Sequence, residues 1–164
     1  MSFLLLQVAA ARADESGPLT HYERLLLASC AVLEAASEGP EGMQAVLNVI
    51  YNRAGGDIHK VVGVVARPKQ FTAFNSATQA DRPDYGPLIE RATSDIAFNT
   101  AYGLVEKMER GTLPDITGGA DHYHADHGGE TPYWTGNMEK TTRIGEHIFY
   151  RSANAKPALV AINE

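Results

Sequence analysis

An acidic side chain inside an apolar segment is the first group in this sequence that could do chemistry. Glu34 lies among the apolar residues of segment 32–36, and Glu38 follows one helical turn later. An apolar environment penalises a charged carboxyl, and a like charge one turn away adds to that penalty, so we expect a raised pKa for Glu34. Such a carboxyl can protonate the leaving oxygen of a glycosidic bond near neutral pH. The alternative, an ordinary surface carboxylate, fits these apolar flanks poorly.

A second group of candidates is the segment HYHADH at residues 122–127. Its His-x-His-x-Asp-His spacing resembles that of metallo-β-lactamase-like hydrolases, in which imidazoles and a carboxylate bind zinc and activate water. That type of site needs more ligands downstream, whereas no Asp follows Asp126 and His147 is the last histidine. We therefore expect no catalytic metal and no cofactor, and we keep a zinc metallohydrolase as the alternative.

The composition limits the partners and the class of protein. The chain has 164 residues, which suits one domain, and its 44% apolar and 21% charged residues are typical of a soluble globular protein. A net charge of −6 with scattered Lys and Arg offers no basic stripe for a phosphate backbone, so nucleic acid is not expected as a partner. The single cysteine, Cys30, lies in an apolar run and is expected to be a buried thiol.

The N-terminal segment resembles a secretory signal only incompletely. FLLLQVAAA is a short apolar run followed by Ala11-Arg12-Ala13, but no Lys or Arg precedes it. We expect an amphipathic helical extension over residues 1–20 that is not removed, and the apolar run is too short to span a bilayer. A domain over residues 21–152 and a tail over 153–164 complete the expected organisation.

The apolar periodicity predicts a mostly helical chain. Residues 21–37 predict a buried helix that ends before Gly39-Pro40, and residues 40–54 predict a second helix. A short helix capped by Asp57 is expected over 57–65, and the longest helix over 83–110. After Gly111 the chain predicts loops with short strands, and residues 143–151 predict a strand or an ordered segment. The fold class is therefore α+β, mainly α-helical.

Four blocks, in order along the chain, carry a resemblance to a known family. They are EAASEGPEGMQAVLNVIYNR at 34–53, QFTAF at 70–74, TGGADHYH at 117–124 and IGEHIFYR at 144–151. Together they resemble the spore cortex-lytic, or cell wall hydrolase, family. The resemblance implies a lysozyme-like transglycosylase fold and cleavage of the β-1,4 bond between N-acetylmuramic acid and N-acetylglucosamine in peptidoglycan. It also implies that Glu34 is the catalytic residue.

The same blocks supply the residues that we expect to contact the glycan. Aromatic side chains meet sugar faces, and polar groups meet acetamido and hydroxyl groups. Phe71 and its neighbour Phe74 are alternatively core anchors of their loop, and Tyr133 joins Trp134 as a stacking candidate. The expected substrate-binding residues are Glu38, Gln70, Phe71, Thr72, Tyr123, His124 and Trp134.

The absence of a second carboxylate in the QFTAF block bears on the reaction. Ordinary glycosidases pair two carboxylates across the bond, whereas a lytic transglycosylase needs one Glu that acts as acid and then as base. The sequence therefore favours the one-Glu route, with plain hydrolysis by a water held by Thr72 or Tyr123 as the alternative.

We expect delivery to the cell wall to depend on another component, because a negatively charged protein is not attracted to an anionic wall. We expect a partner, a larger assembly such as a phage particle, or export. A non-catalytic virion protein that keeps this fold is a further alternative.

Overall fold

Two helices of 15 residues each form the centre of the structure, a computed structural model that describes residues 17–155. α2 (His21–Ala35) begins at a capping box, in which Thr20 and Glu23 each bond the other's backbone N–H. A 3-10 turn, η1 (Ala36–Glu38), and the left-handed Gly39 then redirect the chain into α3 (Gly39–Arg53). Both helices confirm the sequence prediction, and their ends lie within two residues of the predicted ones.

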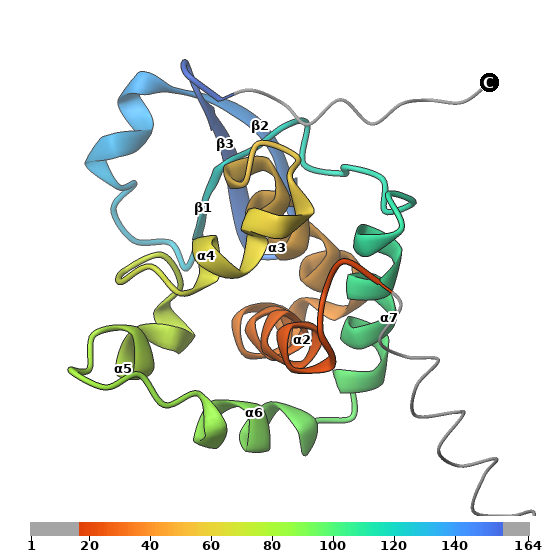
Figure 1. The fold of residues 1–164 in the computed structure, drawn as a ribbon. Helices are drawn as coiled ribbons and strands as arrows, with labels where there is room; N and C mark the ends of the chain where they lie inside the picture. Colours follow the sequence, from red (N-terminus) through yellow and green to blue (C-terminus); the bar gives the residue numbers. More distant parts are fainter. Residues whose placement is uncertain (1–16, 156–164) are drawn as a thin grey trace, which may run out of the picture.

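The remaining helices surround α2 (Figure 1). Asp57 caps η2 (Ile58–Lys60) as expected, and this turn continues into α4 (Val61–Val65). η3 (Thr72–Phe74) and α5 (Asn75–Thr78) form the next short turns. α6 (Gly86–Thr93) and α7 (Phe98–Glu109) both pack against α2.

The single long helix predicted over residues 83–110 is wrong, because the chain breaks between α6 and α7. The hydroxyl of Ser94 donates to the carbonyl of Glu90, and the carboxylate of Asp95 accepts from the N–H of Ala97 at 2.8 Å. Such local side-chain bonds compete with the helical ladder. Ile96, an apolar residue within the predicted helix, is 99% exposed.

A three-stranded antiparallel sheet packs on one side of the helices (Figure 1). Its order is β1 (His122–Ala125), β3 (His147–Ser152) and β2 (Met138–Ile144), with η4 (Tyr133–Asn137) before β2. The strand predicted over 143–151 is therefore a hairpin, since a turn at Gly145, with φ of 56°, separates β2 from β3.

Two groups of buried apolar residues hold these layers together. The larger group fills the space between α2 and the surrounding helices and includes Cys30, the expected buried thiol. The smaller group joins α3 to the sheet and consists of Ala45, Val49, Ala120 and Phe149. The sheet is thus attached to the helical part mainly through α3.

A buried ion pair connects α2 to α7. The Nε of Arg24 lies 2.7 Å from Oε2 of Glu109, and the side chains are 5% and 7% exposed. The N–H of Leu19 also donates to Glu109 at 3.0 Å. These hydrogen bonds, with that of Arg24 the strongest, hold the pKa of Glu109 below its ordinary value although burial opposes them.

Most of the predicted N-terminal helix lies outside the described residues, as do residues 156–164 of the predicted tail. Among residues 17–155, no helix combines the length and the apolar character needed to cross a bilayer.

We expect Glu109→Ala to lower the free energy of unfolding by about 3–5 kcal/mol, because it breaks the buried ion pair with Arg24. Urea unfolding at pH 7 measures this change. Glu139→Ala is the control, since the pair of Glu139 with Arg151 is more exposed and its loss should cost below about 1 kcal/mol.

The same pair predicts a pH dependence. Because the folded-state pKa of Glu109 is lowered, its contribution is complete above the unfolded pKa of about 4.3 and is lost as pH falls through the lower folded value. The difference in unfolding free energy between wild type and Glu109→Ala should therefore shrink below about pH 4. An unchanged difference at pH 3 would contradict this assignment.

Candidate active site

The carboxylate of Glu34 lies where three parts of the chain meet. Glu34 is in the last turn of α2 and is half-buried. Its Oε1 accepts a hydrogen bond from the backbone N–H of Ala73, in η3, at 2.7 Å. Its Oε2 accepts from the hydroxyl of Tyr123, on β1, at 2.9 Å. The two donors come from the QFTAF and TGGADHYH blocks, so the tertiary structure brings these motifs to one carboxyl group.

The hydroxyl of Tyr123 stays protonated over the whole neutral range. Burial raises the pKa of Tyr123 well above 10, and the negative charge on Glu34 raises it further. A phenolic O–H can either donate or accept a hydrogen bond. The hydroxyl of Tyr123 can therefore hydrogen-bond the carboxyl of Glu34 by donating a proton or by accepting one.

A cleft of about 380 Å³ opens beside Glu34. This volume lies in the range of sites that bind small molecules and single units of larger ligands. Its walls come from the end of α2, from η1, η3 and α6, and from the strands β1 and β3. The lining residues are Leu33, Glu34, Ser37, Glu38, Thr72, Ala73, Arg91, Ala125, His127 and His147.

Glu38 shares this cleft but has a structural contact that the sequence did not reveal. Its Oε2 accepts from the backbone N–H of Glu146, in the turn between β2 and β3, at 2.9 Å. A Cβ atom on Gly145 would lie 1.7 Å from that oxygen, so a larger residue there would displace the Glu38 carboxylate and would also be strained at the positive φ of 56°. Glu38 thus holds the hairpin turn against η1, and its predicted contact with substrate stays a prediction.

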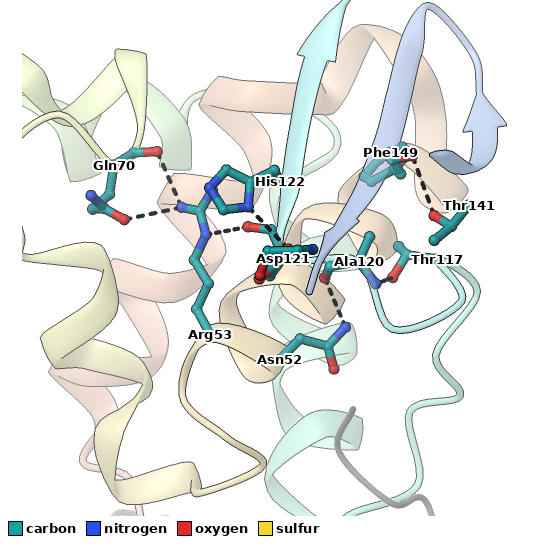
Figure 2. A network of polar contacts seen from close by, with 10 residues as sticks. Asn52, Arg53, Gln70, Thr117, Ala120, Asp121, His122, Thr141 and Phe149 are labelled. Atoms are coloured by element: carbon teal, nitrogen blue, oxygen red, sulfur yellow. Dashed lines mark hydrogen bonds and ion pairs between the residues drawn. The ribbon is translucent and has the colours of Figure 1, made fainter. Parts of the chain in front are cut away.

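A second polar network holds the segments that carry the donors (Figure 2). The Nε of Arg53 donates to the carbonyl of Asp121 at 2.6 Å, and Nη1 lies 3.4 Å from the carbonyl and side-chain oxygens of Gln70. The guanidinium also lies over the ring of Phe71, 5.2 Å from its centroid. Arg53 therefore connects the start of the QFTAF block to the residue before β1.

Two solved structures share this architecture. One is the catalytic domain of the germination-specific lytic transglycosylase SleB from Bacillus anthracis, with 25% identity, a TM-score of 0.58, and coverage of 81% of this chain and 97% of that domain. The other is the catalytic domain of the Bacillus cereus SleB protein, with 26% identity, a TM-score of 0.57, and coverage of 80% and 91%. No curated protein sequence gives a significant match.

The sequence profile of the cell wall hydrolase family matches residues 37–150. The chain belongs to the cell wall hydrolase family. This confirms the resemblance carried by the four blocks, and the lysozyme-like, mainly helical α+β fold is confirmed by the SleB catalytic domains. The matched range begins just after Glu34.

A polar stripe on α3 of this cell wall hydrolase holds the loop before the sheet. Gln44, Asn48 and Asn52 follow one another at four-residue spacing and so share one helix face. The first two donate to the carbonyl of Pro114, while Nδ2 of Asn52 donates to Asp115 and to the buried carbonyl of Ala120. The four-residue spacing of these amides on a largely apolar helix was a signal for the contact between α3 and this loop. We did not predict that contact from the sequence.

Of the predicted glycan contacts, Thr72 and Glu38 line the cleft and Tyr123 bonds Glu34. Gln70 lies instead in a neighbouring hollow of about 340 Å³ beside Arg53. The predicted contact of Phe71 with glycan is corrected. Phe71 is 2% exposed and belongs to the apolar core, which matches its alternative role as a loop anchor.

His124 and Trp134 lie on the other face of the sheet from Tyr123. His124 stacks on Tyr150 with ring centroids 5.6 Å apart, and Trp134 meets both rings edge-on. Alternation along β1 explains this position, because neighbouring residues of a strand point to opposite faces. Their contact with glycan stays a prediction. It would require a glycan strand that extends beyond the cleft of this hydrolase.

The histidines of the zinc alternative do not gather at one point, although His122 and His124, two residues apart on β1, share a face and both contact Trp134. Nδ1 of His122 lies 3.0 Å from Asp121, and the ring nitrogens of His124 lie near the carbonyl of Ala125 and the hydroxyl of Tyr150. His127 lines the cleft. Within residues 17–155, no three His, Cys, Asp or Glu side chains converge as metal ligands would. The structure thus offers the zinc alternative no ligand set in this range.

We expect Asn52→Ala to lower the free energy of unfolding by about 1–3 kcal/mol, because the buried carbonyl of Ala120 loses its donor. Gln44→Ala is the matched control on the same stripe. It should cost less than about 1 kcal/mol, since Asn48 still donates to the carbonyl of Pro114. Urea unfolding of both variants measures the difference, and equal costs would contradict the anchoring role of Asn52.

Proposed function

We propose that this cell wall hydrolase cleaves peptidoglycan glycan strands at the β-1,4 bond between N-acetylmuramic acid and N-acetylglucosamine, with Glu34 as acid and base. The observation that carries the proposal is the half-buried Glu34 carboxyl beside a cleft, held by two uncharged donors from separate motifs. Similarity to SleB catalytic domains, one of them described as a lytic transglycosylase, supports the same reaction.

In the first step Glu34 acts as a general acid. The N–H of Ala73 occupies Oε1, so the proton of the neutral carboxyl is placed on Oε2, beside the hydroxyl of Tyr123. That proton passes to the glycosidic oxygen as its bond to C1 of the muramic sugar breaks. Charge then develops on Glu34, where both donors stabilise it.

In the second step the ionised Glu34 acts as a base. It takes the proton of the muramic C6 hydroxyl, whose oxygen forms a bond to C1 and leaves a 1,6-anhydro end. Glu34 is then protonated again, and no second carboxylate is used. Glu38, the other carboxylate in the cleft wall, is bonded to the turn at Glu146, which supports this one-Glu route. Plain hydrolysis would instead use a water held by Thr72 or Tyr123.

Glu34→Gln tests the assignment, because the amide keeps the shape of the side chain but has no proton to give. Purified sacculi are digested with wild type and variant, with and without EDTA, and the muropeptides are identified by mass spectrometry. We expect 1,6-anhydro ends from wild type in both conditions and a loss of at least about 10³-fold in the variant.

Glu38→Gln is the matched comparison, since it makes the same chemical change one turn away in the same cleft. Its amide oxygen can still accept from Glu146, so we expect anhydro products at a rate within about tenfold of wild type. Loss of cleavage in Glu38→Gln as complete as in Glu34→Gln would replace the one-Glu route by a two-carboxylate mechanism. Loss of cleavage by the wild-type protein in the presence of EDTA would favour the zinc alternative.

Tyr123→Phe removes one of the two donors to Glu34 and leaves the ring contacts with His147 and Phe149 in place. A hydrogen bond to a charged group is worth about 1.5–3 kcal/mol, so we expect kcat to fall roughly 10- to 100-fold. Release of soluble muropeptides gives the rate. Thermal unfolding serves as the control, and unchanged kcat in a folded variant would exclude a role for this hydroxyl.

For delivery we propose a partner or a carrier particle, such as a phage virion, because the net charge of −6 opposes adsorption to an anionic wall. Export and a virion protein without activity are the alternatives, and absence of cleavage by wild type would favour the latter.

A further inference from the structure

His147, the first residue of β3, lines the cleft beside Glu34 and has no role in the reaction described above. The side chain is 8% exposed, and its Nδ1 atom is buried without a hydrogen-bond partner. Polar atoms in protein interiors are nearly always paired. An imidazole with an unpaired ring nitrogen that lines the same cleft as Glu34 therefore points to a function for this residue.

The ring of His147 is held in one position. It meets the ring of Tyr123 edge-on, with centroids 5.1 Å apart and an interplanar angle of 76°. The residue is also paired on both sides in the sheet, with Ala125 of β1 and with Ile144 of β2. Because Tyr123 in turn bonds Glu34, the imidazole is fixed relative to the reacting carboxyl.

The charge state of the ring follows from its surroundings. Burial lowers the pKa of His147, and His127 and His124 act in the same direction, while Glu38 and Glu34 oppose them. Burial is the largest of these effects, so the imidazole is neutral at neutral pH. A neutral imidazole has one N–H and one acceptor nitrogen.

The buried nitrogen decides which tautomer is present. Main-chain N–H groups are rarely buried without a partner, and by the same preference we assign no proton to Nδ1. The proton is then on Nε2. This atom is not among the buried unpaired atoms of the described residues, and His147 lines the cleft, so Nε2 is the nitrogen that a ligand can reach.

We propose that His147 binds substrate, with its Nε2–H donating a hydrogen bond to an uncharged oxygen of the sugar bound against Glu34. The acceptor is an acetamido carbonyl or a sugar hydroxyl. This inference rests on the proposed function. A neutral donor suits the position, because a cation there would favour the ionised form of Glu34 and oppose its action as an acid.

Three substitutions separate the hydrogen bond from packing. His147→Gln places an amide N–H near the position of Nε2, whereas His147→Asn reaches only as far as Nδ1, and His147→Leu fills the buried space without any donor. On peptide-free glycan strands we expect KM to rise about 3- to 10-fold for Leu and Asn, with kcat within about threefold. His147→Gln should stay within about twofold of wild type.

Equilibrium binding in the Glu34→Gln background gives the same comparison without turnover. Adding His147→Leu should weaken the affinity for N-acetylated glycan strands by a similar factor, at an unchanged thermal unfolding midpoint. De-N-acetylated strands then identify the acceptor. An effect of Leu that disappears on these strands assigns the acetamido carbonyl, and an effect that persists assigns a hydroxyl.

A folded His147→Leu protein with wild-type KM and affinity would overturn the inference, and so would equal losses in the Gln and Leu variants. These outcomes differ from failure of the proposed function, in which the wild-type protein itself would neither bind nor cleave the glycan.

Discussion

The half-buried carboxylate of Glu34 is the constraint on which the arrangement of the segments around the cleft depends. A carboxyl removed from water needs hydrogen-bond donors for its oxygens, since burial without them is costly. The donors here, the N–H of Ala73 and the hydroxyl of Tyr123, lie 39 and 89 residues further along the chain. Satisfying one carboxyl therefore fixes a loop and a strand against the end of α2.

The segments that supply these donors have little regular structure of their own, so α3 holds them with polar side chains. Arg53 bonds the carbonyls of Gln70 and Asp121, and Asn52 bonds the carbonyl of Ala120 (Figure 2). Buried backbone carbonyls outside helices and sheets need such donors. The Asn-Arg pair at the end of α3 thus acts on the candidate active site through the backbone of two loops.

Two carboxyl groups of this protein, the buried Glu109 and the half-buried Glu34, show how the choice of partner sets the chemistry. Glu109 is paired with the cation of Arg24, which holds its pKa low and keeps it ionised. Glu34 has no salt bridge among the described residues and is held by an amide and a phenol, both uncharged. This difference suits Glu109 to stability and agrees with the acid and base role proposed for Glu34.

Local pattern in the sequence was sufficient to predict α2, α3, the mainly helical class and the family, because apolar periodicity and Gly-Pro signals act over a few residues. It also made Glu34 the candidate catalytic residue from its apolar flanks, and that assignment stays a prediction. Only the tertiary structure decided where side chains meet: Glu38 bonds a hairpin turn, Phe71 joins the core, and alternation along β1 sends Tyr123 to Glu34 and His124 away from it. Such contacts join residues far apart in the chain, so no local pattern of residue types records them.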